Sequence, residues 1–127
     1  MVSETWAAAT AKGEAMDQGD SKVMFVYVTA RERVQAEEIG LAAVRERLAA
    51  CANVLDNMKS FYWWHGEIQH DSEAVLILKT TAARLEALVA RVKELHSYDV
   101  PCIEALPVIG GFAPYLDWIR AECAPKR

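Results

Sequence analysis

Two apolar stretches on either side of His65-Gly66 constrain this chain most strongly, because they predict a long β-hairpin. Residues 53–64 and 67–81 are rich in aromatic and β-branched residues, which favour strands. Glycine tolerates the positive φ of a two-residue hairpin turn, so the turn is expected at His65-Gly66. The ingoing arm of about 12 residues would be ~40 Å long, whereas a 100-residue domain has a radius of gyration of ~13 Å. The hairpin is therefore expected to extend beyond its own domain.

Consecutive aromatic residues end the ingoing arm: Phe61, Tyr62, Trp63 and Trp64. Because successive side chains of a strand point to opposite faces, both faces of the tip are predicted to be aromatic. Such side chains bury ~150–250 Å² each, and together they exceed the few hundred Å² of apolar patch that a soluble monomer usually exposes. We therefore expect another subunit to cover the tip, with Phe61, Trp63 and Trp64 in the interface.

The composition describes an ordinary globular chain. Its 127 residues suit one domain, and the formal net charge is −4. This acidic balance argues against nucleic acid or an anionic membrane as the main partner. No apolar run approaches the ~20 residues of a membrane span, and the N-terminus shows no secretory signal. A cytoplasmic location is expected.

The three cysteines, Cys51, Cys102 and Cys123, include no close pair. Disulfide scaffolds and structural zinc sites both need tighter spacing, so these residues are interpreted as small buried hydrophobes or incidental thiols.

The domain is predicted over residues 22–123, with a flexible N-terminal tail over residues 1–21 and a C-terminal tail over residues 124–127, because neither end shows a sustained hydrophobic period. The predicted strands cover residues 23–28, 53–64, 67–81 and 102–108, and the predicted helices cover residues 34–50, 83–96 and 114–122. Asp56-Asn57 suggests a bulge in the hairpin. Gly40 suggests that the first helix approaches the sheet closely. Pro107 favours an edge position for the last strand.

This order, β-α-β-β-α-β plus one helix, predicts an α+β, ferredoxin-like antiparallel sheet. The two main helices can cover only one face of such a sheet. Residues 23–28 and 74–78 are apolar on both faces, so the second face also needs a cover. This is a second argument for an oligomer.

The sequence offers little catalytic chemistry, and no enzymatic activity is expected. It contains no G-x-S-x-G, H-E-x-x-H or phosphate-binding glycine-rich loop. Arg31 follows the first strand as in small acyl-phosphate hydrolases, but the glycine-rich cradle is missing. Phe25 and Tyr27 could stack RNA bases on this topology, although the acidic charge argues against that function. A nucleophile pair of Cys51 with a histidine is not favoured.

The histidines do not show metal-ligand spacing. His65 and His70 lie on opposite hairpin arms, and pairing about the turn places His70 across from Phe61. His96 stands at a predicted helix C-terminus, where histidine usually interacts with the helix dipole or caps the last carbonyl groups.

Several separated motifs closely resemble the CutA divalent-cation-tolerance family, in the right order from about residue 22 to residue 122. These motifs are Leu48-Ala49-Ala50-Cys51-Ala52-Asn53, Ser60-x-Tyr62-x-Trp64-x-Gly66 with Glu73 and Lys79-Thr80, His96-Ser97-Tyr98-Asp99-Val100-Pro101, and Tyr115-Leu116-Asp117-Trp118-Ile119. The resemblance implies a tight homotrimer whose long hairpins reach neighbouring subunits, similar to the PII signalling proteins. It also implies a link to tolerance of copper and other divalent cations, without an established reaction.

The sequence departs from the family pattern at residues that bear on metal binding. Members that look copper-competent carry a cysteine where this chain has Val28 and a histidine pair where it has Leu95-His96. In addition, this chain has Arg31 where the family usually has proline, and Glu104 where the family commonly has an aliphatic residue. The resemblance therefore leaves His96 as the candidate ligand for a divalent cation such as Cu²⁺, and predicts weak binding or binding by other groups.

The PII-like comparison implies an alternative function, in which the clefts between subunits hold a small-molecule ligand. The candidate cleft residues are the polar and aromatic members of the motifs: Tyr62, Trp64, Glu73, Lys79, His96 and Tyr98. A purely structural interpretation makes Tyr62 and Trp64 interface anchors, Glu73 and Lys79 an interfacial ion pair, and Tyr98 a core residue.

Overall fold

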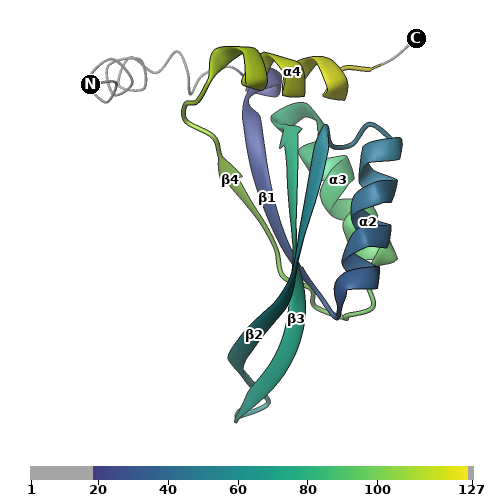
Figure 1. The fold of residues 1–127 in the computed structure, drawn as a ribbon, viewed down its shortest axis with the longest axis vertical. Coiled ribbons are helices and arrows are strands. Elements are labelled where there is room, and N and C mark those ends of the chain that lie inside the picture. Colours follow the sequence, from purple (N-terminus) through teal and green to yellow (C-terminus); the bar gives the residue numbers. More distant parts are fainter. Residues whose placement is uncertain (1–18, 126–127) are drawn as a thin grey trace.

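The computed structural model describes residues 19–125 and confirms the predicted order of elements (Figure 1). The elements are the 3₁₀ turn η1 (Gly19–Ser21), β1 (Val23–Ala30), α2 (Arg33–Arg45), β2 (Cys51–Trp64), β3 (Glu67–Thr81), α3 (Ala82–Leu95), β4 (Ile103–Pro107) and α4 (Ala113–Cys123). The strands form one antiparallel sheet in the order β2-β3-β1-β4, so β4 lies at an edge as predicted. Residues 1–18 of the predicted tail and residues 126–127 lie outside the described residues.

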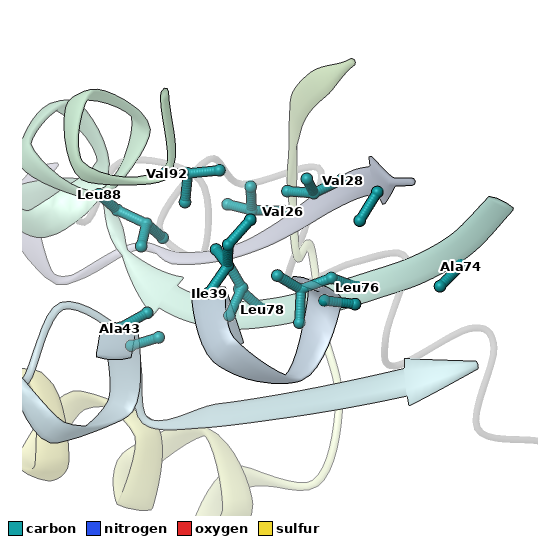
Figure 2. Packing of buried hydrophobic residues seen from close by; sticks show 12 residues of the cluster. Val26, Val28, Ile39, Ala43, Ala74, Leu76, Leu78, Leu88 and Val92 are labelled. Carbon is teal, nitrogen blue, oxygen red and sulfur yellow. The ribbon is translucent and has the colours of Figure 1, made fainter. Parts of the chain in front are cut away.

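The core lies between the sheet and helices α2 and α3, which cover the same face (Figure 1). Strand residues that point to this face, such as Val26 and Leu76, are fully buried against Ile39 of α2 and Leu88 of α3 (Figure 2). Alternate residues of a strand share a face, so the partly buried Phe25 and Tyr27 of β1 point the opposite way. We call that opposite side of the sheet the open face.

Helix α4 covers only one end of the open face, where Ile119 and Cys123 pack on Val23. Farther along the open face, Leu55 of β2 is 58% exposed and Leu106 of β4 is 50% exposed. The prediction that the two main helices leave the second face without a full cover is therefore confirmed for the described residues. No helix of residues 19–125 is long and apolar enough to cross a membrane.

The hairpin turn lies at His65-Gly66, as predicted. Both residues have positive φ, 53° for His65 and 79° for Gly66, which is the conformation of a type I′ turn. The turn follows β2 directly and precedes β3. In Figure 1 the hairpin extends well beyond the ends of α2, α3 and β1, at the opposite end of the molecule from α4.

The predicted bulge lies in β2. Leu55 pairs with Val75 and Met58 pairs with Glu73, so Asp56 and Asn57 together oppose a single residue of β3. Asn57 adopts the left-handed conformation with φ of 63°, which asparagine tolerates better than most residues. The bulge moves Met58 onto the open face and increases the local bend of the arm.

The first helix is shorter than predicted, because it ends at Arg45 instead of near residue 50. Arg47 has a φ of 61°, and the N–H groups of Arg47 and Leu48 donate to the carbonyl groups of Val44 and Ala43. This left-handed turn ends the helix and satisfies its last carbonyl groups. The apolar residues after Arg47 continue the helical spacing in sequence, but they lead into β2.

Candidate functional site

The hairpin tip exposes aromatic side chains on both of its faces, as predicted. Phe61 is 67% exposed and Trp63 is 71% exposed, while Tyr62 and Trp64 on the other face are also exposed. Phe61 pairs with His70 across the hairpin, and their rings meet edge-on with centroids 4.9 Å apart. The tip therefore presents a broad apolar surface, and its contact with another subunit stays a prediction.

At the base of the hairpin, three of the predicted cleft residues form one hydrogen-bond network. The Tyr98 hydroxyl donates to Oε2 of Glu73 at 2.9 Å, and the Tyr98 N–H donates to Nδ1 of His96 at 3.1 Å. Nε2 of His96 lies 2.7 Å from the carbonyl oxygen of Thr29. The network thus joins β3, the loop after α3 and the end of β1.

Both ring nitrogens of His96 are engaged in this network. Nδ1 accepts a hydrogen bond, so the proton that Nε2 shares with the Thr29 carbonyl defines a neutral tautomer. The ring is buried and bonds to β1, whereas His96 caps the end of α3 through its backbone N–H, which donates to the carbonyl group of Lys93. A metal ion could reach either nitrogen only by displacing one of these bonds.

The described residues of this chain do not by themselves fit a copper site. Within residues 19–125, no group of three or more His, Cys, Asp or Glu side chains is close enough to hold a metal ion. Val28, at the position where the resemblance described above implies a cysteine in copper-competent members, is fully buried in the core. The assignment of His96 as a metal ligand stays a prediction.

Acidic and phenolic groups gather on the open face near Glu73. Burial raises the pKa of Tyr27, and the nearby Cys102, Glu73 and Glu104 raise it further. Burial and then Glu104 likewise raise the pKa of Cys102. Among the described residues, neither Glu73 nor Glu104 forms an ion pair with Lys or Arg. Of these acidic and phenolic residues, only Glu73 was predicted from the sequence as a site residue. The β1–β4 pairing places Tyr27 directly opposite Glu104.

Tyr62 and Trp64 extend this surface toward the tip. The Tyr62 hydroxyl donates to Oδ2 of Asp71, and this bond raises the pKa of the phenol. Trp64 lies farther out, with its ring edge-on to the His65 ring at a centroid distance of 5.1 Å. Asp71 was not among the site residues predicted from the sequence. Its position two residues before Glu73 on β3 is the sequence signal that could have identified it.

Lys79 lies apart from the other predicted cleft residues. It follows Glu73 by six residues on β3, a separation of about 20 Å along an extended strand. Its Nζ lies over the Tyr115 ring, 5.6 Å from the centroid, and Tyr115 stacks on Trp118. The described chain therefore brings Glu73, His96 and Tyr98 together but not Lys79, and Glu73 and Lys79 form no ion pair within it.

The family described as "CutA1 divalent ion tolerance protein" matches residues 24–122. The "Divalent-cation tolerance protein CutA" of Thermus thermophilus is 45% identical over 95 residues, which cover 75% of this chain and 92% of that protein. The "Protein CutA 1, chloroplastic" of Oryza sativa is 42% identical over 95 residues, 75% of this chain. The match covers only 54% of the rice protein, so the chain spans about half of that relative.

Solved structures of CutA proteins also resemble this chain in fold and sequence. The crystal structure of CutA from Xylella fastidiosa superposes with a TM-score of 0.79 at 36% identity, and covers 81% of this chain and 99% of that one. The word chloroplastic in the rice protein's name applies to that protein alone. The cytoplasmic location expected for this chain stays a prediction.

Proposed function

Because this chain belongs to the CutA1 divalent ion tolerance protein family, we propose that it acts in divalent-cation tolerance as a non-enzymatic homotrimer. Family membership carries the cation-tolerance part of this proposal, and the hairpin tip carries the assembly part, because Phe61 and Trp63 on one face and Tyr62 and Trp64 on the other are exposed. Surfaces of this kind on soluble proteins are usually covered by a partner. A second copy of the chain is the proposed partner.

The open face of the sheet supports the same proposal. Leu55 and Leu106 are exposed there beside the partly buried Phe25 and Ile77. When an antiparallel sheet leaves one face to solvent, that face usually carries polar residues. In the proposed trimer the open faces meet, and each hairpin tip packs on a neighbour.

We propose that a divalent cation such as Cu²⁺ binds where subunits meet, since one subunit does not fit a metal. Cys102 and Glu104 are the proposed donors, because the Cys102 thiol lies 3.8 Å from Oε1 of Glu104 on the edge strand side of the open face. A thiolate and a carboxylate are both ligands for copper, and two subunits would supply the number that one subunit lacks.

The assembly can be tested by analytical ultracentrifugation of the Trp63→Ser/Trp64→Ser double variant. We expect the unchanged chain to sediment as a trimer and the double variant as a monomer, because the tip loses its apolar contact area. Phe112→Ser is the matched control, since Phe112 is 74% exposed but lies at the start of α4. A double variant that is still trimeric would refute the proposed role of the tip.

The metal contact can be tested by calorimetric titration with Cu²⁺. We expect binding to the trimer, weaker binding to Glu104→Gln, and no binding to the dissociated Trp63→Ser/Trp64→Ser variant. His96→Ala separates the two assignments: binding that is lost in a folded, trimeric His96→Ala variant would favour His96 over the intersubunit donors.

A second candidate function is a PII-like module that holds a small molecule between subunits. The network of Glu73, Tyr98 and His96 favours it, because a buried carboxylate and a partly buried phenol next to an uncovered face resemble a polar anchor for a ligand. A thermal-shift screen of metabolites tests this function. A stabilising ligand should lose its effect in Tyr98→Phe while sedimentation still shows a trimer.

A further inference from the structure

A pocket of about 330 Å³ lies where the start of α3 meets η1 and the end of α4. Its charged lining residues come from these three elements: Asp20 from η1, Arg84 from α3 and Arg120 from α4. The pocket thus combines two guanidinium groups with one carboxylate. It lies beside α4, at the opposite end of the molecule from the hairpin tip (Figure 1). We call it the α3 pocket.

A hydroxyl group faces the α3 pocket from the N-cap of α3. A threonine at this position usually accepts a hydrogen bond from an N–H group of the first helical turn. The Thr81 hydroxyl makes no such bond, and it has no other hydrogen-bond partner among residues 19–125. Thr81 is only 5% exposed, yet no fully enclosed side-chain oxygen of the described residues lacks a partner. The hydroxyl oxygen is therefore accessible, and the pocket that Thr81 lines is where a ligand would meet it.

The first turn of α3 adds backbone N–H groups to this hydroxyl. The first N–H groups of a helix have no partner within the helix, and the aligned peptide dipoles place about half a positive charge there. The N–H group of Ala82 donates to the carbonyl group of Lys22. The next two residues, Ala83 and Arg84, receive no side-chain cap from Thr81, and both line the pocket. Helix starts of this kind accommodate anions.

The side chain of Arg84 adds a fixed cation. Its Nε donates to the carbonyl oxygen of Cys123 at 2.7 Å, which anchors the guanidinium group between α3 and the end of α4. A guanidinium group has five N–H donors, and this bond uses only one of them. Within residues 19–125 Arg84 forms no ion pair. Its remaining donors can therefore bind an anion in the pocket.

The other charged groups leave the charge of Arg84 uncompensated. Arg120 donates through Nε to the carbonyl oxygen of Ser21, and its Nη1 lies 2.8 Å from Oδ1 of Asp117, so this ion pair is close to neutral. Asp20 lines the pocket but is exposed, and water and salt screen an exposed charge strongly. Arg84 is only partly exposed, so its charge is screened less.

We propose that the α3 pocket binds a phosphate group, either as the free ion or as part of a small phosphate ester. Its oxygens would accept hydrogen bonds from the Thr81 hydroxyl, the first-turn N–H groups and Arg84. A phosphate group suits these donors because its several acceptor oxygens point in different directions. None of the donors belongs to the metal contact or to the intersubunit cleft proposed above, so failure of this proposal would leave both untouched.

Phosphorus NMR and calorimetry on the full chain can test the site, with inorganic phosphate and glycerol 3-phosphate as probes in chloride buffer of constant ionic strength. We expect both probes to bind at millimolar concentration, and the tighter of the two identifies the free ion or the ester as the occupant. Arg84→Gln and Thr81→Val should each weaken binding about tenfold, because each loses a hydrogen bond to a charged group. Thr81→Ser keeps the hydroxyl and should stay within about twofold of the unchanged protein.

Two further variants separate the pocket from the net charge of the protein. Arg45→Gln is the matched control, because Arg45 is exposed in the last turn of α2 and forms no ion pair among the described residues. It should leave the affinity unchanged. Asp20→Asn should strengthen binding, because it removes a carboxylate from the lining.

Circular dichroism and sedimentation show whether each variant keeps its fold and assembly. The proposal is overturned if neither probe binds at millimolar concentration, or if folded Arg84→Gln and Thr81→Val both bind the probes as well as the unchanged protein. Equal weakening by Arg45→Gln and Arg84→Gln would also overturn it, because net charge and not the pocket would then govern binding.

Discussion

The Tyr98 hydroxyl donates a hydrogen bond to the Glu73 carboxylate, with 2.9 Å between the two oxygens. This bond joins the loop after α3 to the hairpin strand β3, and Glu73 is buried beneath it. Burial raises the pKa of the Tyr98 phenol well above its usual range, and the bond to Glu73 raises it further. The phenol therefore stays protonated at any physiological pH and keeps donating to the carboxylate.

The first prediction concerns stability at alkaline pH. Because folding raises the pKa of Tyr98, its contribution to the free energy of unfolding is complete below the unfolded value of about 10 and is lost as the pH rises toward the folded value. Tyr98→Phe should therefore show a smaller loss of stability between pH 9 and about 11 than the unchanged protein. Urea unfolding at each pH measures this difference.

Glu73→Gln is the control for the alkaline experiment. It removes the negative charge but keeps an oxygen acceptor, so its alkaline loss should lie between those of the unchanged protein and Tyr98→Phe. Other phenols and thiols also titrate in this range, and the difference between variants isolates Tyr98. Equal pH profiles for all three proteins would contradict the prediction.

The second prediction concerns the buried ring of His96. His96→Phe keeps a planar ring but leaves the Thr29 carbonyl and the Tyr98 N–H without their partners. Loss of partners for buried polar groups costs about 1–3 kcal/mol, so urea unfolding should show a decrease of this size. His70→Phe, at an exposed position in the hairpin, should change the stability little. Equal effects of the two substitutions would refute the structural role of His96.

The third prediction concerns the bulge at Asn57. Valine pays about 1–2 kcal/mol in the left-handed conformation, so Asn57→Val should destabilise the protein by about that amount. Asn57→Gly should be neutral or slightly stabilising because glycine adopts this φ freely. Chemical unfolding measures both variants. Asn53→Val, in a regular part of β2, is the comparison, and an equal loss there would show that the left-handed φ is not the cause.

The fourth prediction concerns the close contact of α2 with the sheet at Gly40. A Cβ at residue 40 would lie 2.9 Å from Cδ1 of Leu76 and 3.1 Å from Cβ of Ala52. Alanine gains about 1 kcal/mol of helix propensity, but overpacking of a core typically costs 1–3 kcal/mol. Because Leu76 is fully buried and has little space to move, we expect Gly40→Ala to lower the free energy of unfolding.

Leu76→Val gives a test of this cause. If the contact with Leu76 is responsible, Gly40→Ala should cost less in a Leu76→Val background than in the unchanged chain, and a double-mutant cycle measures that difference. Strictly additive effects of the two substitutions would contradict the packing explanation.

Local patterns predicted much of the fold. The His65-Gly66 turn, the Asp56-Asn57 bulge and the edge position of the last strand all follow from the φ preferences or hydrogen-bond capacity of the residues concerned. Such preferences act within a few residues of the chain, so the sequence displays them directly. The end of α2 was harder to predict from the sequence, because the apolar residues after Arg47 fit the end of a helix and the start of a strand equally well.

The candidate site was only partly predictable. The family motifs contained Glu73, His96 and Tyr98, and the structure joins them in one network. The same motifs contained Lys79, which the extended geometry of β3 carries about 20 Å away from Glu73. Two residues that belong to the same family motifs need not lie close together in the fold. For Glu73 and Lys79, the extended strand between them sets the distance.

The sequence by itself determined the order of the elements, the length of the hairpin and the aromatic character of both faces of its tip, since these depend on side-chain periodicity and turn chemistry. Only the tertiary structure decided the partners of the polar groups. It placed both nitrogens of His96 in hydrogen bonds and set the Lys79 ammonium group over the Tyr115 ring, which stacks on Trp118. Such contacts join residues distant in the chain, and their geometry depends on how the sheet, the helices and the loops pack together.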